Sequence, residues 1–104
     1  MVAKVARELL PALDHLEHAV KAAAGHEDVV KGFVLVSDEI VAALARAGIE
    51  SFSPEGEPFD PNEHEAMAAH AAEDVEPGTV IEVYQRGYRL DGQILRPARV
   101  VVAE

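Results

Sequence analysis

Five histidines are the side chains of this 104-residue chain whose chemistry first suggests a metal site. The segment HEAMAAH, which starts at His64, resembles the zinc-binding pattern in which two histidines four positions apart share one helical face with a glutamate base beside them. The residue four positions after His64 is Ala68, and the next histidine, His70, falls on a different part of a helical surface. His15 and His18 could share a helical face, but neither belongs to the apolar stripe of its segment. We therefore expect no metal and no cofactor.

The other groups capable of catalysis lack the surroundings that catalysis needs. Asp60, Glu63 and Glu65 could transfer protons, but they lie in a turn-rich segment where turn formation and helix capping explain them. The chain has no cysteine, which excludes disulfides and thiol nucleophiles. The serines and glycines stand in neither a nucleophile-elbow nor a phosphate-loop pattern. We expect a protein that is not an enzyme.

Composition excludes several classes of partner. The chain carries 19 acidic and 9 basic residues, a formal net charge of −10, so we expect no binding to nucleic acid or to an anionic membrane surface. No apolar run approaches the ~18 residues of a membrane-spanning helix, and no secretory signal is visible. Together with the absence of cysteine, this pattern is compatible with a cytoplasmic or a matrix location.

The charge is unevenly distributed along the chain. Residues 53–82 contain nine acidic residues and no lysine or arginine, whereas residues 83–104 contain four arginines. Those arginines are Arg86, Arg89, Arg96 and Arg99. Two interpretations stay open: an ordinary solvated surface, or an arginine-bearing end that meets a partner of opposite charge.

The elements that must position these side chains begin with an amphipathic helix. Between residues 2 and 24 the apolar positions advance by alternating steps of four and three, which is a heptad pattern. The stripe consists of Val2, Ala6, Leu9, Leu13, Leu16, Val20 and Ala23. Pro11 interrupts this helix and predicts a kink, because proline removes one backbone donor.

A second helix is predicted over residues 28–47, with Asp28 as its cap and Gly48 as the left-handed residue after its end. Its apolar face is wider than one partner helix can cover. A helical hairpin that dimerises into a four-helix bundle would bury both helices' apolar faces. We expect the dimer interface to be lined by Leu9, Leu13, Leu16, Val20, Phe33 and Ile40.

The second half predicts a small all-β domain. Turn-forming clusters follow the second helix, a short helical turn fits Glu63–Ala69, and strands fit Thr79–Tyr84 and Ala98–Ala103. The expected fold class is therefore α+β, with a helical hairpin over residues 1–50 and a β-meander over residues 51–104.

A hairpin is the strongest local signal in this half. Asp-Gly at positions 91 and 92, between two extended runs, is typical of a type I′ turn. We expect this turn to pair Leu90 with Gln93 and Tyr88 with Leu95.

Several ordered blocks carry a wider resemblance. They are EPFDPNEHEAM from Glu57, DVEPGTV from Asp74, QRGYRLDG from Gln85 and ILRPARVVV from Ile94, while LLPALDHLE from Leu9 adds a block in the first helix. These blocks, at these separations, closely resemble the GrpE family of nucleotide exchange factors. The resemblance runs from about residue 5 to the end of the chain.

The resemblance implies a fold and a function. The fold is a homodimeric four-helix bundle followed by a small β-domain. The function is that of a cytoplasmic co-chaperone, which binds the nucleotide-binding domain of a DnaK-type heat-shock chaperone and holds its cleft open so that ADP leaves. Differential affinity for the open state would drive this exchange.

The resemblance also implies a set of chaperone contacts, carried over by motif position. They are Phe59, Asp60, Pro61, Tyr84, Gln85, Gln93, Arg96 and Val102. At Gln93 the family often has an arginine, so either the contact shifts to Arg96 or the chaperone is bound more weakly.

Family members also carry a long N-terminal helix, and we expect this chain to lack most of it. Two alternative functions stay open at this point. One is a dimeric scaffold with the same fold and no exchange activity, and the other is a metal-dependent hydrolase that uses His64 and nearby acids.

Overall fold

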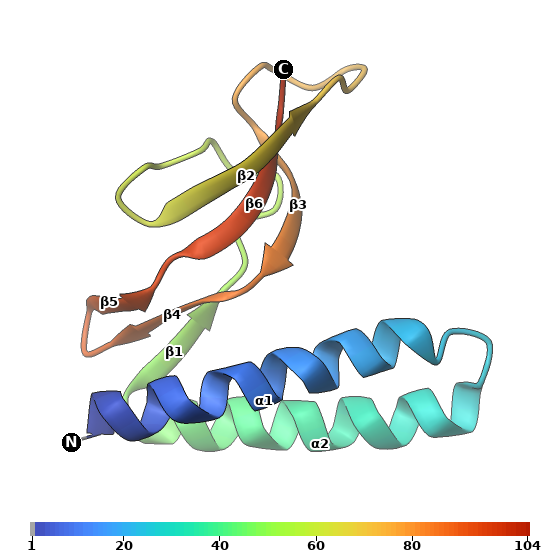
Figure 1. Ribbon diagram of the computed structural model, residues 1–104, viewed down its shortest axis with the longest axis vertical. Helices are drawn as coiled ribbons and strands as arrows, with labels where there is room; N and C mark the ends of the chain where they lie inside the picture. Colours follow the sequence, from blue (N-terminus) through green and yellow to red (C-terminus); the bar gives the residue numbers. More distant parts are fainter. Residues whose placement is uncertain (1) are drawn as a thin grey trace. The chain divides into compact units, whose positions relative to one another are not determined.

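A computed structural model describes residues 2–104, which form two compact units that divide between Gly48 and Ile49. The first unit contains two helices, and the second contains six strands with their connecting loops (Figure 1). The predicted α+β fold class is therefore confirmed.

The helical unit is a hairpin of α1 (Val2–Ala22) and α2 (Glu27–Arg46), which lie side by side (Figure 1). Helix α1 runs through Pro11 as one continuous element. Its buried residues are Ala6, Leu10 and Leu13, a spacing of four and three. Leu10 is only 1% exposed, whereas Leu9, which the heptad pattern selected, is 53% exposed in the single chain.

The helix ends differ from the prediction at one cap. Residue His26, not Asp28, occupies the N-cap position of α2, and no side chain caps that end. Asp28 lies inside the first turn, where its charge favours the positive end of the helix dipole. At the other end Gly48 has a φ of 89°, which confirms the predicted left-handed residue after the helix.

The β-unit contains two three-stranded sheets. Its strands are β1 (Ile49–Phe52), β2 (His64–His70), β3 (Val80–Gln85), β4 (Gly87–Leu90), β5 (Gln93–Arg96) and β6 (Ala98–Ala103). The strand orders are β1-β4-β5 and β2-β6-β3. The prediction of a meander was wrong, because β2 pairs in parallel with β6 across a long stretch of intervening chain.

Residues 64–70 form a strand, so the predicted helical turn at Glu63–Ala69 was also wrong. The alanines and Met67 in this segment favour a helix locally. Pairing with the β-branched residues of β6 overrides that preference, since Ala66 lies opposite Val100 and Ala69 opposite Val102.

The β4–β5 hairpin is confirmed at its turn and corrected beyond it. Asp91 and Gly92 have φ angles of 49° and 86°, as a type I′ turn requires, and Leu90 pairs with Gln93. Tyr88 pairs with Arg96 instead of Leu95, because the register shifts between Tyr88 and the following residue.

A compact apolar cluster holds the second sheet together. Val80, Ala98 and Val100 are fully buried. The side chains of Phe52, Phe59, Val83 and Val102 pack against them. Phe59, the first of the implied contact residues, belongs to the loop that precedes β2 and joins this loop to the cluster.

Candidate functional site

The segment Phe59–Pro61 is fixed by hydrogen bonds on both sides. The N–H of Phe59 donates to the carbonyl of Gly78 at 2.9 Å. The Asp60 carboxylate accepts the N–H of Asn62 at 2.9 Å, which closes an Asx turn around the proline. Phe59 packs against the apolar cluster, whereas Pro61 is exposed. The segment is therefore a short turn at the surface that is anchored at one end by the ring of Phe59.

His64 joins this segment to β2. The residue is 6% exposed, and its Nδ1 accepts the N–H of Asp60 at 2.9 Å. The N–H of His64 donates in turn to the Asp60 carbonyl at 2.8 Å. The ring centroid lies 5.7 Å from that of Phe59 in an edge arrangement and 6.4 Å from that of Phe52. The histidine that first suggested a metal ligand is therefore a buried partner of a backbone turn.

Arg89 of β4 covers the other aromatic ring of this group. Its guanidinium carbon lies 4.1 Å from the centroid of Phe52, a cation–π contact. The same guanidinium forms an ion pair with the carboxylate of Glu63. Both side chains are about one-third exposed, so solvent screens the pair and its contribution to stability is small.

Gly87 makes room for the Phe52 ring. The two residues lie opposite each other in the β1–β4 pairing. A Cβ atom at Gly87 would lie 2.2 Å from Cζ of Phe52, so only glycine allows the ring to rest on the backbone there.

Arg96 lies at the end of β5 with its side chain held in place. Its Nε donates to the carbonyl of Arg86 at 3.0 Å, and its guanidinium carbon lies 5.2 Å from the centroid of the Tyr88 ring. The register shift in the hairpin places Arg96 opposite Tyr88, and this shift therefore makes the contact possible. Because Gln85 directly precedes Arg86, this hydrogen bond brings the Arg96 side chain close to the backbone next to Gln85.

The remaining implied contact residues occupy different positions. Tyr84 is 44% exposed on β3, and Gln93 is exposed at the start of β5, beside the hairpin turn. Val102 packs against the same apolar cluster as Phe59. The structure thus separates the implied set into residues exposed at the surface and residues packed within the β-unit.

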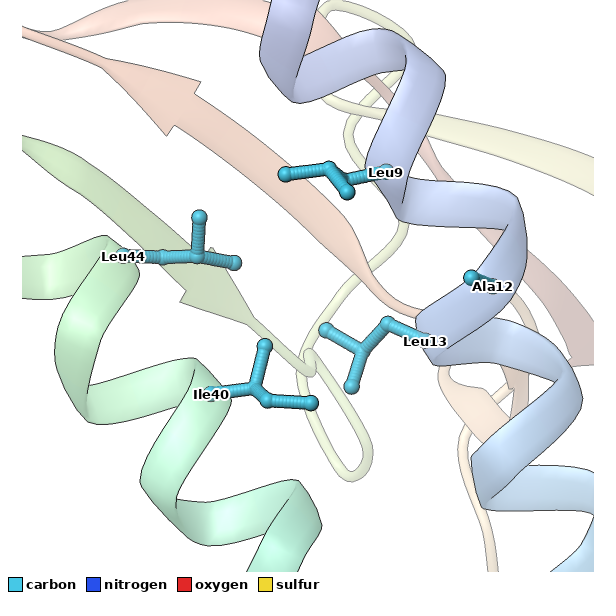
Figure 2. A pocket seen from close by; sticks show the side chains of 5 residues that line it. All are labelled: Leu9, Ala12, Leu13, Ile40 and Leu44. Atoms are coloured by element: carbon cyan, nitrogen blue, oxygen red, sulfur yellow. The ribbon is translucent and has the colours of Figure 1, made fainter.

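The helical unit carries a separate apolar groove (Figure 2). It is lined by Leu9, Ala12, Leu13, Ile40 and Leu44. Figure 2 shows the leucine and isoleucine side chains of the two helices pointing toward one another across the groove. Leu9 and Ile40 are 53% and 38% exposed in the single chain, so an apolar strip from both helices faces outward.

Within residues 2–104 no group of three or more histidine or acidic side chains is arranged to hold a metal ion. The same residues include no helix whose length and apolar character would let it cross a membrane.

Comparison with known proteins decides the family. A family model described as GrpE matches residues 1–104. The chain belongs to the GrpE family. Protein GrpE of Saccharophagus degradans is 45% identical over 105 residues, which cover 97% of this chain and 54% of that protein. Protein GrpE of Vibrio harveyi is 43% identical with coverages of 97% and 53%, and that of Francisella tularensis subsp. mediasiatica is 40% identical with coverages of 99% and 54%.

This chain spans about half the length of the curated GrpE relatives it matches. Sequence reasoning found the family and named Arg89 only as one of four arginines at the basic end, but it missed Phe52 and Gly87 and the contacts that join the three residues. The signal for them was weak, because β1 is only four residues long and its partner β4 lies far along the chain. An isolated glycine inside a strand pattern, such as Gly87, was the one available indication of close backbone approach.

Proposed function

We propose that this GrpE-family chain acts as a co-chaperone that promotes release of ADP from a DnaK-type heat-shock chaperone. The match of the GrpE family model to residues 1–104 carries this proposal. The ordered turn at Phe59–Pro61 and the held side chain of Arg96 support it, because a preorganised surface binds without the cost of ordering loops and side chains.

Exchange by such a protein requires no bond chemistry. The factor binds the open state of the chaperone's nucleotide-binding domain more tightly than the closed state and so raises the open population. Binding of the exchange factor and binding of ADP weaken each other. By linkage, the factor by which the exchange factor lowers ADP affinity equals the factor by which ADP lowers the affinity for the exchange factor. A rigid β-unit suits this role, since a flexible surface would adapt to both states and shift neither.

We assign the direct chaperone contacts to the exposed part of the implied set. Asp60, Pro61, Tyr84 and Gln93 are exposed or half-buried, and Arg96 presents its guanidinium beside Tyr88. Phe59 and Val102 support that surface from the core, and Gln85 precedes the carbonyl that Arg96 binds. Where the family often has arginine, Gln93 offers hydrogen bonds without charge, so Arg96 supplies the positive charge of this surface.

The functional state we propose is a homodimer in the cytoplasm. The apolar strip that includes Leu9 and Ile40 would be buried by the same strip of a second copy, giving a four-helix bundle. Leu16, Val20 and Phe33 are half-buried in the single chain and would complete the same interface.

Stopped-flow release of a fluorescent ADP analogue from a DnaK-type chaperone tests the proposal. We expect saturating amounts of the protein to accelerate release by at least about tenfold, which corresponds to a barrier to ADP release lowered by about 1.4 kcal/mol. No acceleration at saturation would contradict it. Binding without acceleration would instead favour a dimeric scaffold with the same fold.

The variant Arg96→Ala locates the interaction. We expect it to weaken chaperone binding by about ten- to a hundredfold, since a charge-assisted hydrogen bond contributes about 1.5–3 kcal/mol. Arg46→Ala, in the last turn of α2, is the matched control with the same loss of charge outside the β-unit. Equal affinities of the two variants would remove Arg96 from the contact surface.

A further inference from the structure

His64 contacts the Phe59–Pro61 segment through both its backbone and its imidazole. Both backbone polar groups of Asp60 bind it: the Asp60 N–H donates to Nδ1 at 2.9 Å, and the Asp60 carbonyl accepts the His64 N–H at 2.8 Å. The residue is 6% exposed, and its imidazole lies against Phe59 and Phe52. One residue therefore closes the turn through its backbone and its side chain at once.

The geometry makes Nδ1 of His64 a hydrogen-bond acceptor. A nitrogen that accepts a backbone N–H carries no proton, so Nδ1 is the unprotonated nitrogen in this arrangement. Phenylalanine could fill the same space between Phe52 and Phe59 but has no acceptor. The acceptor, rather than the bulk of the ring, is the property for which histidine is needed here.

We propose that His64 is a positioning residue for chaperone binding, which holds Asp60 and Pro61 in the conformation that the chaperone contacts. Without the Nδ1 acceptor, the half-buried Asp60 N–H loses its partner, and the turn moves to hydrate it. The turn then has to be ordered again on binding, which lowers affinity without removing any contact residue. This inference rests on the proposed function, since it concerns the same binding surface.

Three substitutions separate the acceptor from the ring. His64→Asn places an amide oxygen at the position of Nδ1 and loses the ring. His64→Ala loses both the acceptor and the ring, and His64→Phe keeps a ring and loses the acceptor. We expect His64→Asn to bind a DnaK-type nucleotide-binding domain within about threefold of the unaltered protein, and the other two to bind about tenfold or more weakly.

Stability should follow a different order from affinity. His64→Phe keeps the packing against the two phenylalanines, whereas His64→Asn leaves a cavity and should have the lower unfolding midpoint in urea. A purely structural role would make affinity follow stability, so that His64→Phe binds better than His64→Asn. That order, or equal weakening in all three variants, would overturn the proposal.

His70→Phe is the matched control. It makes the same exchange on the same strand, at an exposed position at the other end of β2, and should leave chaperone affinity unchanged. If the control weakens binding as much as His64→Phe does, the effect belongs to β2 as a whole and the proposal fails.

A measurement on the unaltered protein keeps the proposal testable if a variant does not fold. Long-range ¹H–¹⁵N NMR spectra distinguish the two nitrogens of His64, and we expect Nδ1 to be unprotonated and the Asp60 amide to be protected from exchange. A proton on Nδ1 would overturn the proposal. If the unaltered protein shows this geometry but binds no chaperone, the proposed function fails, whereas normal binding by His64→Ala defeats only the role of His64.

Discussion

Replacing Gly87 by alanine is the sharpest test of how the β-unit is packed. The new Cβ would lie 2.2 Å from Cζ of Phe52 and 2.6–2.7 Å from its two Cε atoms, far inside contact distance. The ring must therefore move away. It cannot do so freely, because Arg89 lies over it at 4.1 Å and His64 lies beside it.

The expected cost follows from these contacts. Over-packing a fitted site costs about 1–3 kcal/mol, and losing the cation–π contact of Arg89 adds about 0.5–1 kcal/mol at this exposure. No φ in the left-handed region is involved at Gly87, so the effect is steric. A loss of about 2 kcal/mol in a unit of this size lowers its melting temperature by roughly 8–16 °C.

The two tyrosines make this change measurable in one unit alone. Tyr84 and Tyr88 both lie in the β-unit, so their near-ultraviolet circular dichroism reports on that unit, while the signal at 222 nm is dominated by α1 and α2. We expect Gly87→Ala to lower the melting temperature followed by the tyrosine signal and to leave the melting temperature followed at 222 nm unchanged.

Gly32→Ala is the matched control, because the same atom is added where nothing lies within 4 Å. Gly32 lies inside α2, so the exchange should stabilise the helical unit by about 0.5–1 kcal/mol. If the melting temperature of the tyrosine signal is unchanged or higher in Gly87→Ala, the packing of Phe52 on the glycine backbone is refuted.

Three other changes test separate features. Leu9→Asp should raise the dissociation constant of the proposed dimer by at least about a hundredfold, because it buries a charge in the interface. Leu35→Asp, at an exposed position of α2, should leave that constant unchanged. A dimer of Leu9→Asp that persists in light scattering would show that Leu9 lies outside the interface. A double-mutant cycle of Glu63→Gln and Arg89→Gln should give a coupling of about 0.2–1 kcal/mol that shrinks in 1 M salt, and salt-independent coupling would contradict a screened ion pair. Gly92→Ala should lower the free energy of unfolding of the β-unit by about 1 kcal/mol, as followed by the tyrosine signal, since the φ of Gly92 is 86°. A gain in stability would argue against the type I′ turn.

The features that sequence reasoning predicted depend on neighbours along the chain. The helical hairpin follows from an apolar period that each helix carries by itself, and the Asp91-Gly92 turn follows from the backbone preferences of two residues. The strand Ala98–Ala103 was predicted with its observed bounds, because its run of β-branched residues is unambiguous.

The features that were missed depend on partners far along the chain. The segment at residues 64–70 is rich in helix-forming alanine, and only its pairing with β6 makes it a strand. The register shift beside Tyr88 has no sequence signal of its own, yet it decides whether Leu95 or Arg96 lies opposite the tyrosine. For the candidate site, motif position supplied the implied contacts, while the burial of His64 and the stacking of Arg89 required the fold.

The central place of β6 in its sheet has a consequence for synthesis of the chain on the ribosome. Strand β6 lies between β2 and β3, and it follows both of them in the chain. The sheet β2-β6-β3 cannot form until residues through Ala103 have left the exit tunnel, whereas α1 and α2 emerge complete much earlier. During that interval the nascent chain displays a finished helical hairpin with its apolar strip, followed by an unpaired β2. The proposed assembly of two hairpins can thus precede completion of the surface that we propose binds the chaperone.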